Sequence, residues 1–230
     1  MMLRDLAAAA HMPAAKAHRY LVSLTRMQLV EQQKDTGMYD LGAYALDLGL
    51  NALGRLQPLN VAAPFLRELN SEIAQTVALA VWANRGATIV SWIGPDAPVA
   101  ASLRVGSVMP LTRSATGLAF LAFLPKEVTA ELLQKELAEN VRLGLAPKSA
   151  ADIACEIEQI RRSGFARTSA FIPGINGLAI PIFDHLGSMT LAMVALGYAG
   201  NIDLTDKGSI VAKVQSKARE LSSRLGYPLK

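Results

Sequence analysis

The chain has 230 residues, of which 51% are hydrophobic and 18% charged, and its net charge is +4. This length allows one large domain or two smaller ones, with enough apolar material for a core. A single cysteine excludes an intramolecular disulfide framework and suits a reducing compartment. Since no apolar run approaches the ~18 residues of a membrane span and the N-terminus does not resemble a cleavable signal, we expect a cytoplasmic protein without a membrane partner.

The first forty residues predict two helices followed by a hairpin. Leu3–Ala10 indicates a short helix, His11–Pro13 a turn, and Ala14–Leu29 a longer second helix. Val30–Tyr39 then indicates a hairpin. This order is typical of a winged helix-turn-helix, whose second helix enters the major groove of DNA.

The second helix is expected to bury Leu21, Leu24 and Val22 and to present polar side chains to DNA. The candidate DNA-binding residues are Lys16, His18, Arg19, Ser23, Arg26 and, in the hairpin, Lys34. Basic and acidic residues are nearly balanced over this segment, so one copy alone would bind phosphates weakly and a dimer would double the contacts. Two short helices and a hairpin also occur in domains that bind no DNA, and Arg19 has the alternative of pairing with Glu31.

A linker helix is predicted over residues 42–57. An apolar stripe begins at Leu41 and continues through Tyr44, Leu48, Ala52 and Leu56. An exposed stripe of this kind is usually a partner surface, which predicts a homodimer or homotetramer. The alternative is that the stripe packs against the second half of the same chain.

The remaining residues predict strand hairpins with helices grouped around them. The expected strands are Thr76–Trp82, Ala87–Ile93, Ala101–Val105, a region from Gly164, Leu178–Phe183 and Met189–Leu196. The expected helices are Val61–Ile73, Arg113–Phe123, Lys126–Leu137, Ala150–Ser163 and a last one capped near Asp203. This arrangement predicts an α+β domain with a central antiparallel sheet. Cys155 falls in a helical pattern and is expected to be a buried or half-buried structural thiol.

Five segments, in order and spacing, carry a resemblance that spans nearly the whole chain. They are Leu6-Ala7…Pro13…His18-Arg19-Tyr20-Leu21; Tyr39-Asp40-Leu41-Gly42; Ala63-Pro64-Phe65-Leu66-Arg67-Glu68-Leu69; Val105-Gly106-Ser107-Val108-Met109-Pro110-Leu111-Thr112…Gly117; and Pro173-Gly174…Ile180-Pro181-Ile182-Phe183-Asp184 with Gly197. Together they resemble the IclR-type transcriptional regulators.

The resemblance implies a winged helix-turn-helix domain at 1–41, a linker helix at 42–57 and a GAF-like effector-binding and oligomerisation domain at 58–230. It implies operator DNA and a small-molecule effector as partners, dimers or tetramers, and neither catalysis nor a cofactor. The family has a further helix before Leu3, which is absent from this sequence. Ala14 and Ala15 replace residues that are usually polar in the family, which shifts the expected DNA contacts to Lys16, His18 and Arg19.

The effector site is predicted at the start of the helix that follows Arg113. Backbone N–H groups at a helix start suit a carboxylate, and Ser114 and Thr116 add hydroxyl groups. The alternative is that Ser114 or Thr112 only caps the helix. The full candidate set is Met109, Ser114, Ala115, Thr116, Arg167, Gly177, Val194 and Leu196.

The resemblance also bears on the size and polarity of the effector. Small-acid sensors of the family place hydroxyl residues on the last strand, where this chain has Val194 and Leu196, and an acidic residue where it has Arg167-Thr168-Ser169. The pocket is therefore expected to be more apolar and to take a bulkier or aromatic ligand, with Phe171, Met109 and Met193 as further candidate lining residues.

These predictions favour a DNA-binding transcriptional regulator that senses a small organic acid. One alternative is a sensing and oligomerisation module without effective DNA binding. A small-molecule enzyme is less favoured, because His11, His18 and His185 have no neighbouring nucleophile or metal-binding motif.

Overall fold

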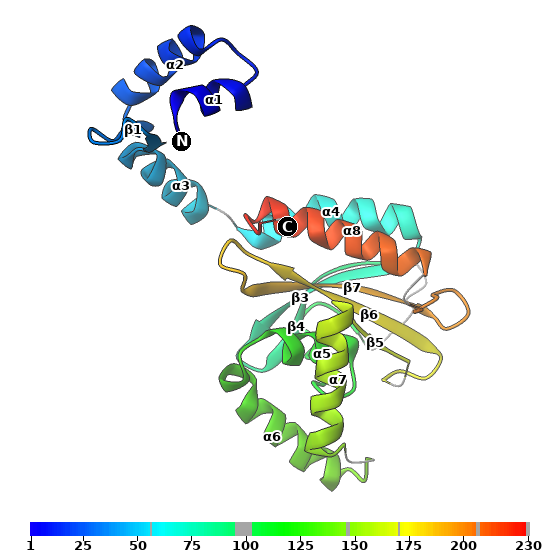
Figure 1. Cartoon of the computed structure of the whole chain (residues 1–230). Helices are drawn as coiled ribbons and strands as arrows, with labels where there is room; N and C mark the ends of the chain where they lie inside the picture. Colours follow the sequence, from blue (N-terminus) through cyan, green and yellow to red (C-terminus); the bar gives the residue numbers. More distant parts are fainter. Residues whose placement is uncertain (56, 95–102, 146–147, 170, 206–207, 229–230) are drawn as a thin grey trace. The chain divides into compact units, whose positions relative to one another are not determined.

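The computed structural model describes residues 1–230 except 56, 95–102, 146–147, 170, 206–207 and 229–230. The chain divides into two compact units, Met1–Leu56 and Gln57–Lys230. Each unit has its own fold (Figure 1) and its own set of buried residues.

The first unit is a helix-turn-helix followed by a two-stranded hairpin and a further helix. Its elements are α1 (Leu3–Ala9), α2 (Ala14–Arg26), β1 (Val30–Gln32), β2 (Tyr39–Leu41) and α3 (Ala43–Arg55). His11 adopts a left-handed backbone conformation in the turn, and Pro13 precedes the first residue of α2. Strands β1 and β2 pair antiparallel, so the predicted order of helix, turn, helix and hairpin is confirmed.

The core of this unit is small. Among the described residues of this unit, the buried hydrophobic ones are Ala7, Ala17, Leu21 and Tyr39. The prediction that Leu24 and Val22 are buried is wrong, since both are 38% exposed. The other described elements pack only against the side of α2 that carries Ala17 and Leu21, which leaves Val22 and Leu24 exposed. Leu41, predicted at the start of the linker stripe, lies in β2 with its side chain exposed.

The second unit is built on a five-stranded antiparallel sheet. Its strands are β3 (Thr76–Ala83), β4 (Gly86–Ile93), β5 (Ala166–Thr168), β6 (Ile175–Phe183) and β7 (Met189–Tyr198), in the spatial order β4-β3-β7-β6-β5. Its helices are α4 (Pro58–Ile73), α5 (Ala115–Phe123), α6 (Lys126–Arg142), α7 (Ala150–Ser163) and α8 (Ser209–Arg224). The predicted α+β architecture with a central antiparallel sheet is confirmed.

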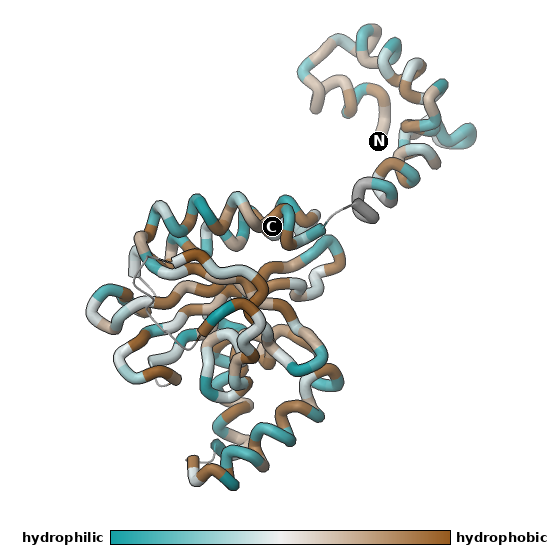
Figure 2. Tube along the Cα trace, turned by 180° about the vertical axis from the view of Figure 1, so that it is seen from behind, coloured by the Kyte–Doolittle hydropathy of each residue, from teal (hydrophilic) through white to brown (hydrophobic). Residues whose placement is uncertain are grey.

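Two helical layers enclose the sheet. Helices α4 and α8 cover one face, and α5 with α7 cover the other (Figure 1). Each core strand therefore needs apolar side chains on both faces, and the central strands are brown along most of their length in Figure 2. On β3, Val77 and Leu79 belong to the core below α4 and α8, while Ala78 and Ala80 belong to the core below α5.

The predicted strand Ala101–Val105 is not found. Residues 101–102 lie outside the described residues, and Leu103–Val105 form no strand. The chain instead turns at Gly106, whose φ is +89°, and meets the edge of β4 from Gly106 onward, where the Gly106 N–H donates to the Ile89 carbonyl at 2.8 Å. Thr88 and Val108 form an isolated bridge there. Cys155 is exposed on α7, contrary to the buried or half-buried position predicted for it.

Candidate DNA-binding surface and effector site

The basic residues of α2 lie on one side of the helix. Lys16, Arg19, Ser23 and Arg26 follow one another at spacings of three or four residues, so their side chains share a side of the helix. Leu21 points into the core from the opposite side. All four are exposed, which leaves their polar groups available to a nucleic acid.

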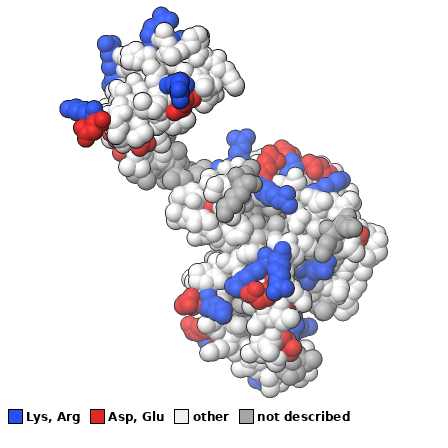
Figure 3. Space-filling model, viewed as in Figure 1, with Lys and Arg blue, Asp and Glu red and all other residues white. Residues whose placement is uncertain are grey.

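The other predicted DNA contacts are also exposed. His18 lies away from that side of the helix, and Lys34 lies in the turn between β1 and β2. The hydroxyl of Ser23 donates to the carbonyl of Arg19 at 3.3 Å. Within the described part of the chain, Arg19 has no ion-pair partner, so the alternative pairing with Glu31 is not formed. Figure 3 shows that charged groups are sparse on the visible face of this unit.

Helix α5 begins at the predicted effector site. Ser114 is its N-cap: the Ser114 hydroxyl accepts from the Gly117 N–H at 2.9 Å and donates to the Pro110 carbonyl at 2.6 Å. The capping alternative therefore describes this side chain, whose only hydroxyl proton is already used. The N–H groups of Ala115 and Thr116 belong to the first turn and have no acceptor within the helix.

Helix α6 and the segment just before α7 hold the loop that leads into α5. The Glu136 carboxylate accepts from the Leu111 N–H at 2.5 Å, from the Thr112 N–H at 2.8 Å and from the Thr112 hydroxyl at 2.6 Å. On the other side, Lys148 donates to the Thr112 carbonyl at 2.8 Å and pairs with Glu156 at 2.6 Å. The roles of Glu136 and Lys148 could not be predicted from the sequence, because each residue lies far along the chain from the loop that it holds.

The sheet brings several predicted effector residues together under α5. Gly177 on β6 is paired with Leu196 on β7. A Cβ at Gly177 would lie 3.2 Å from the Leu196 side chain and 3.8 Å from that of Ala115. Val194 and Met109 belong to the same buried cluster as Ala115 and Leu196. The predicted site is thus an apolar floor beneath the start of α5.

Two predicted residues do not join this group. Arg167 on β5 is paired with Leu178, whose side chain belongs to the opposite core. Its guanidinium donates to the Leu204 carbonyl at 2.6 Å and lies 5.7 Å from the centre of the Phe165 ring. Met193 also belongs to the core below α4 and α8. Neighbouring residues of a strand point to opposite faces, which separates Arg167 and Met193 from Val194.

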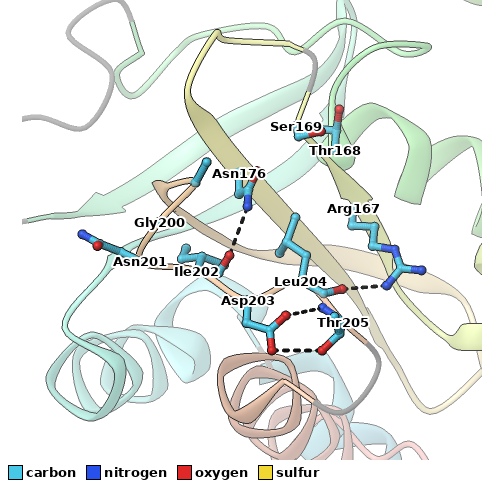
Figure 4. Close-up of a pocket in the computed structure, with 11 residues that line it drawn as sticks. Arg167, Thr168, Ser169, Asn176, Gly200, Asn201, Ile202, Asp203, Leu204 and Thr205 are labelled. Carbon is cyan, nitrogen blue, oxygen red and sulfur yellow. Dashed lines mark hydrogen bonds between the residues drawn. The ribbon is translucent and has the colours of Figure 1, made fainter.

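Arg167 instead lines a separate cavity of about 850 Å³ between the end of β5 and the loop after β7 (Figure 4). The polar groups that line this cavity largely form hydrogen bonds with one another. For example, the side-chain amide of Asn176 donates to the Ile202 carbonyl at 3.0 Å. Hydrogen bonds from the backbone N–H and the hydroxyl of Thr205 hold the pKa of the Asp203 carboxyl below its usual value.

Two family models match most of the chain. The model of the IclR helix-turn-helix domain matches residues 1–34, and that of the bacterial transcriptional regulator IclR C-terminal domain matches residues 50–223. The transcriptional repressor IclR of Escherichia coli K12 is 28% identical over 97% of this chain and 82% of its own length.

Solved structures agree with these matches. The crystal structure of HmgR from Pseudomonas aeruginosa is 36% identical, covers 100% of this chain and 92% of its own, and has a TM-score of 0.92. An IclR homologue from Microbacterium hydrocarbonoxydans, solved in complex with 4-hydroxybenzoate, is 22% identical over 98% of this chain and 91% of its own, with a TM-score of 0.61.

The fold and the matches define a transcriptional regulator with an N-terminal helix-turn-helix DNA-binding domain and a C-terminal ligand-binding domain. The chain belongs to the IclR family. None of the helices that the structure describes combines the length and the apolar character needed to cross a membrane.

Proposed function

We propose that this regulator senses an aromatic or otherwise apolar organic acid bound between the start of α5 and the sheet. The observation that carries the proposal is the pairing of first-turn N–H groups, at Ala115 and Thr116, with an apolar floor at Gly177, Val194 and Leu196. The N–H groups suit a carboxylate and the floor suits a ring. The Microbacterium hydrocarbonoxydans relative, which binds the aromatic acid 4-hydroxybenzoate, supports this class of effector.

The proposal extends to the assembly and its surroundings. Helix α3 exposes Tyr44 and Leu48, which favours a homodimer or homotetramer formed through this helix. Lys16, His18, Arg19, Ser23, Arg26 and Lys34 are the proposed operator contacts. A regulator that binds chromosomal DNA is placed in the cytoplasm, and the relatives' role in transcription favours a protein without catalytic activity.

Thermal unfolding of the full chain tests the effector class. Benzoate and phenylacetate should raise Tm more than pyruvate or glyoxylate at equal concentration, because a bound ligand stabilises only the folded state. Thr116→Val should reduce the ligand-induced shift without lowering the Tm of the free protein. Thr129→Val, at a buried threonine of α6, is the matched control. A larger shift with pyruvate or glyoxylate than with every aromatic acid would overturn the proposal.

A further inference from the structure

The first strand of the sheet holds a buried hydroxyl that lacks a partner. Thr76 is 1% exposed, and its Oγ1 has no hydrogen-bond partner among the described residues. Leaving a buried polar group unpaired is costly, so each such group in a folded protein calls for an explanation. The Thr76 hydroxyl makes none of the hydrogen bonds that hold the start of α5.

Thr76 lies on the same face of the sheet as the proposed effector site. It is paired with Leu196 on β7, and Leu196 is paired with Gly177 on β6. Residues directly opposite each other on neighbouring strands point to the same face. The Thr76 side chain therefore shares the α5 side of the sheet with Leu196 and Ala115.

A second hydrogen-bonding group lies beside it. A Cβ at Gly94 would lie 2.9 Å from the Thr76 hydroxyl oxygen and 3.3 Å from the indole Nε1 of Trp92. Trp92 is half-buried and packs against the core below α5. Its indole N–H only donates, whereas a threonine hydroxyl both donates and accepts. Both polar atoms therefore lie close to the α5 side of Gly94, and a ligand hydroxyl placed between them can accept from Trp92 and donate to Thr76.

The distance across the sheet from Thr76 to Gly177 agrees with the length of one aromatic ring that carries a polar group at each end. Thr76 on β3 and Gly177 on β6 are separated by β7, so they lie two strand spacings apart, about 10 Å. Ala115, at the start of α5, lies over Gly177. Between these two ends the floor carries the small residue Ala78 and apolar Val194 and Leu196. A single aromatic ring with a polar group at each end spans such a site.

We propose that Thr76 and Trp92 form the specificity-determining end of the effector site, where they recognise a hydroxyl group on the ring of an aromatic acid. The proposal rests on the proposed function, which places the carboxylate at the start of α5.

Binding measured by calorimetry tests the proposal with benzoate, 3-hydroxybenzoate and 4-hydroxybenzoate as probes. The unaltered protein should bind at least one hydroxybenzoate about tenfold or more tightly than benzoate, because a site built to bond a hydroxyl disfavours the analogue that lacks it. Thr76→Val and Trp92→Phe should each bring this ratio close to one while benzoate binding is kept. Gly94→Ala should do the same by filling the space between the two groups.

Two matched variants serve as controls. Thr190→Val removes a hydroxyl at the other end of β7, where it donates to the Ile182 carbonyl at 3.3 Å. Trp82→Phe alters the other tryptophan, which packs against Phe120. Both should leave the hydroxybenzoate-to-benzoate ratio unchanged. Without ligand, Thr76→Val should keep or raise Tm, because it removes an unpaired buried hydroxyl.

The outcomes separate this inference from the proposed function. If benzoate binds but the unaltered protein does not prefer a hydroxybenzoate, or if Thr76→Val keeps that preference, only the present inference is overturned. A Tm that falls in Thr76→Val more than in Thr190→Val also overturns it, since the hydroxyl then has a partner in the free protein. If no aromatic acid binds, the proposed effector class and this inference fall together.

Discussion

At the residue scale, two helical glycines have opposite surroundings. A Cβ at Gly117, in α5, would collide with the Pro110 carbonyl and the backbone of Leu111. A Cβ at Gly49, in α3, would meet nothing within 4 Å. Gly117 therefore allows α5 to approach the loop that precedes it, whereas Gly49 only loosens its own helix.

Alanine at these positions should act in opposite directions. Gly117→Ala should destabilise the second unit by about 1–3 kcal/mol, because the backbone of the loop must move. Gly49→Ala should stabilise α3 by up to ~1 kcal/mol. Both tryptophans lie in the second unit, so urea unfolding followed by fluorescence reports that unit. The midpoint should fall in Gly117→Ala and stay unchanged in Gly49→Ala; equal midpoints would contradict the close packing of α5.

Lys16 is the second prediction at this scale. It is exposed on the side of α2 that carries Arg19 and Arg26. Lys16→Ala should weaken binding to a random duplex and reduce the salt dependence by about one phosphate contact. Fluorescence anisotropy at several salt concentrations measures both quantities, with Lys135→Ala on α6 as the control. An unchanged salt slope would remove Lys16 from the phosphate contacts.

At the element scale, the position of α5 depends on α6 and on the segment between α6 and α7, both of which follow it in the chain. Glu136 of α6 accepts three hydrogen bonds from Leu111 and Thr112, and Lys148 binds the Thr112 carbonyl. Hydrogen bonds to a charged group are stronger than those between neutral groups. The loop that opens the proposed effector site is thus held from both sides.

Glu136→Gln should loosen this loop. An amide has one acceptor oxygen and cannot replace both carboxylate oxygens, so we expect a loss of about 1–3 kcal/mol in the stability of the second unit. The Tm shift caused by benzoate should shrink as well. Glu139→Gln on the same helix is the control, because Glu139 forms only an exposed pair with Arg142. Equal effects of the two substitutions would show that Glu136 does not hold the loop.

At the scale of the whole molecule, the chain exposes apolar side chains on α3. Tyr44, Leu46 and Leu48 are 43%, 64% and 47% exposed. Tyr44 and Leu48 are four residues apart and lie on one side of the helix, whereas Leu46 points to the other side. A pair of copies that joined through Tyr44 and Leu48 would bury this stripe.

Sedimentation velocity tests this association. The unaltered protein should sediment as a dimer or larger assembly at tens of micromolar. Tyr44→Glu or Leu48→Glu should shift it toward the monomer, because a charge would be placed in the apolar interface. Leu46→Glu, at an equally apolar position on the other side, should leave the assembly intact. A monomeric unaltered protein, or equal dissociation by Leu46→Glu, would contradict the predicted interface.

The sequence by itself determined the order and type of most elements. Apolar residues at helical or alternating spacing predicted α2, β3, β4 and β7 within a few residues. Such patterns are local, because each follows from the geometry of one helix or strand. The motifs of the family are also short contiguous segments of sequence, so the family could be recognised without a structure.

The tertiary structure alone decided which groups share a site. Strand register places Thr76, Leu196 and Gly177 in one row, and it turns Arg167 to the opposite face. The hydrogen bonds of Ser114 at the start of α5, and those that Glu136 accepts from Thr112, decide which polar groups remain available to a ligand. These facts depend on pairing between segments far apart in the chain, because a one-residue change of register reverses the face to which every side chain of a strand points.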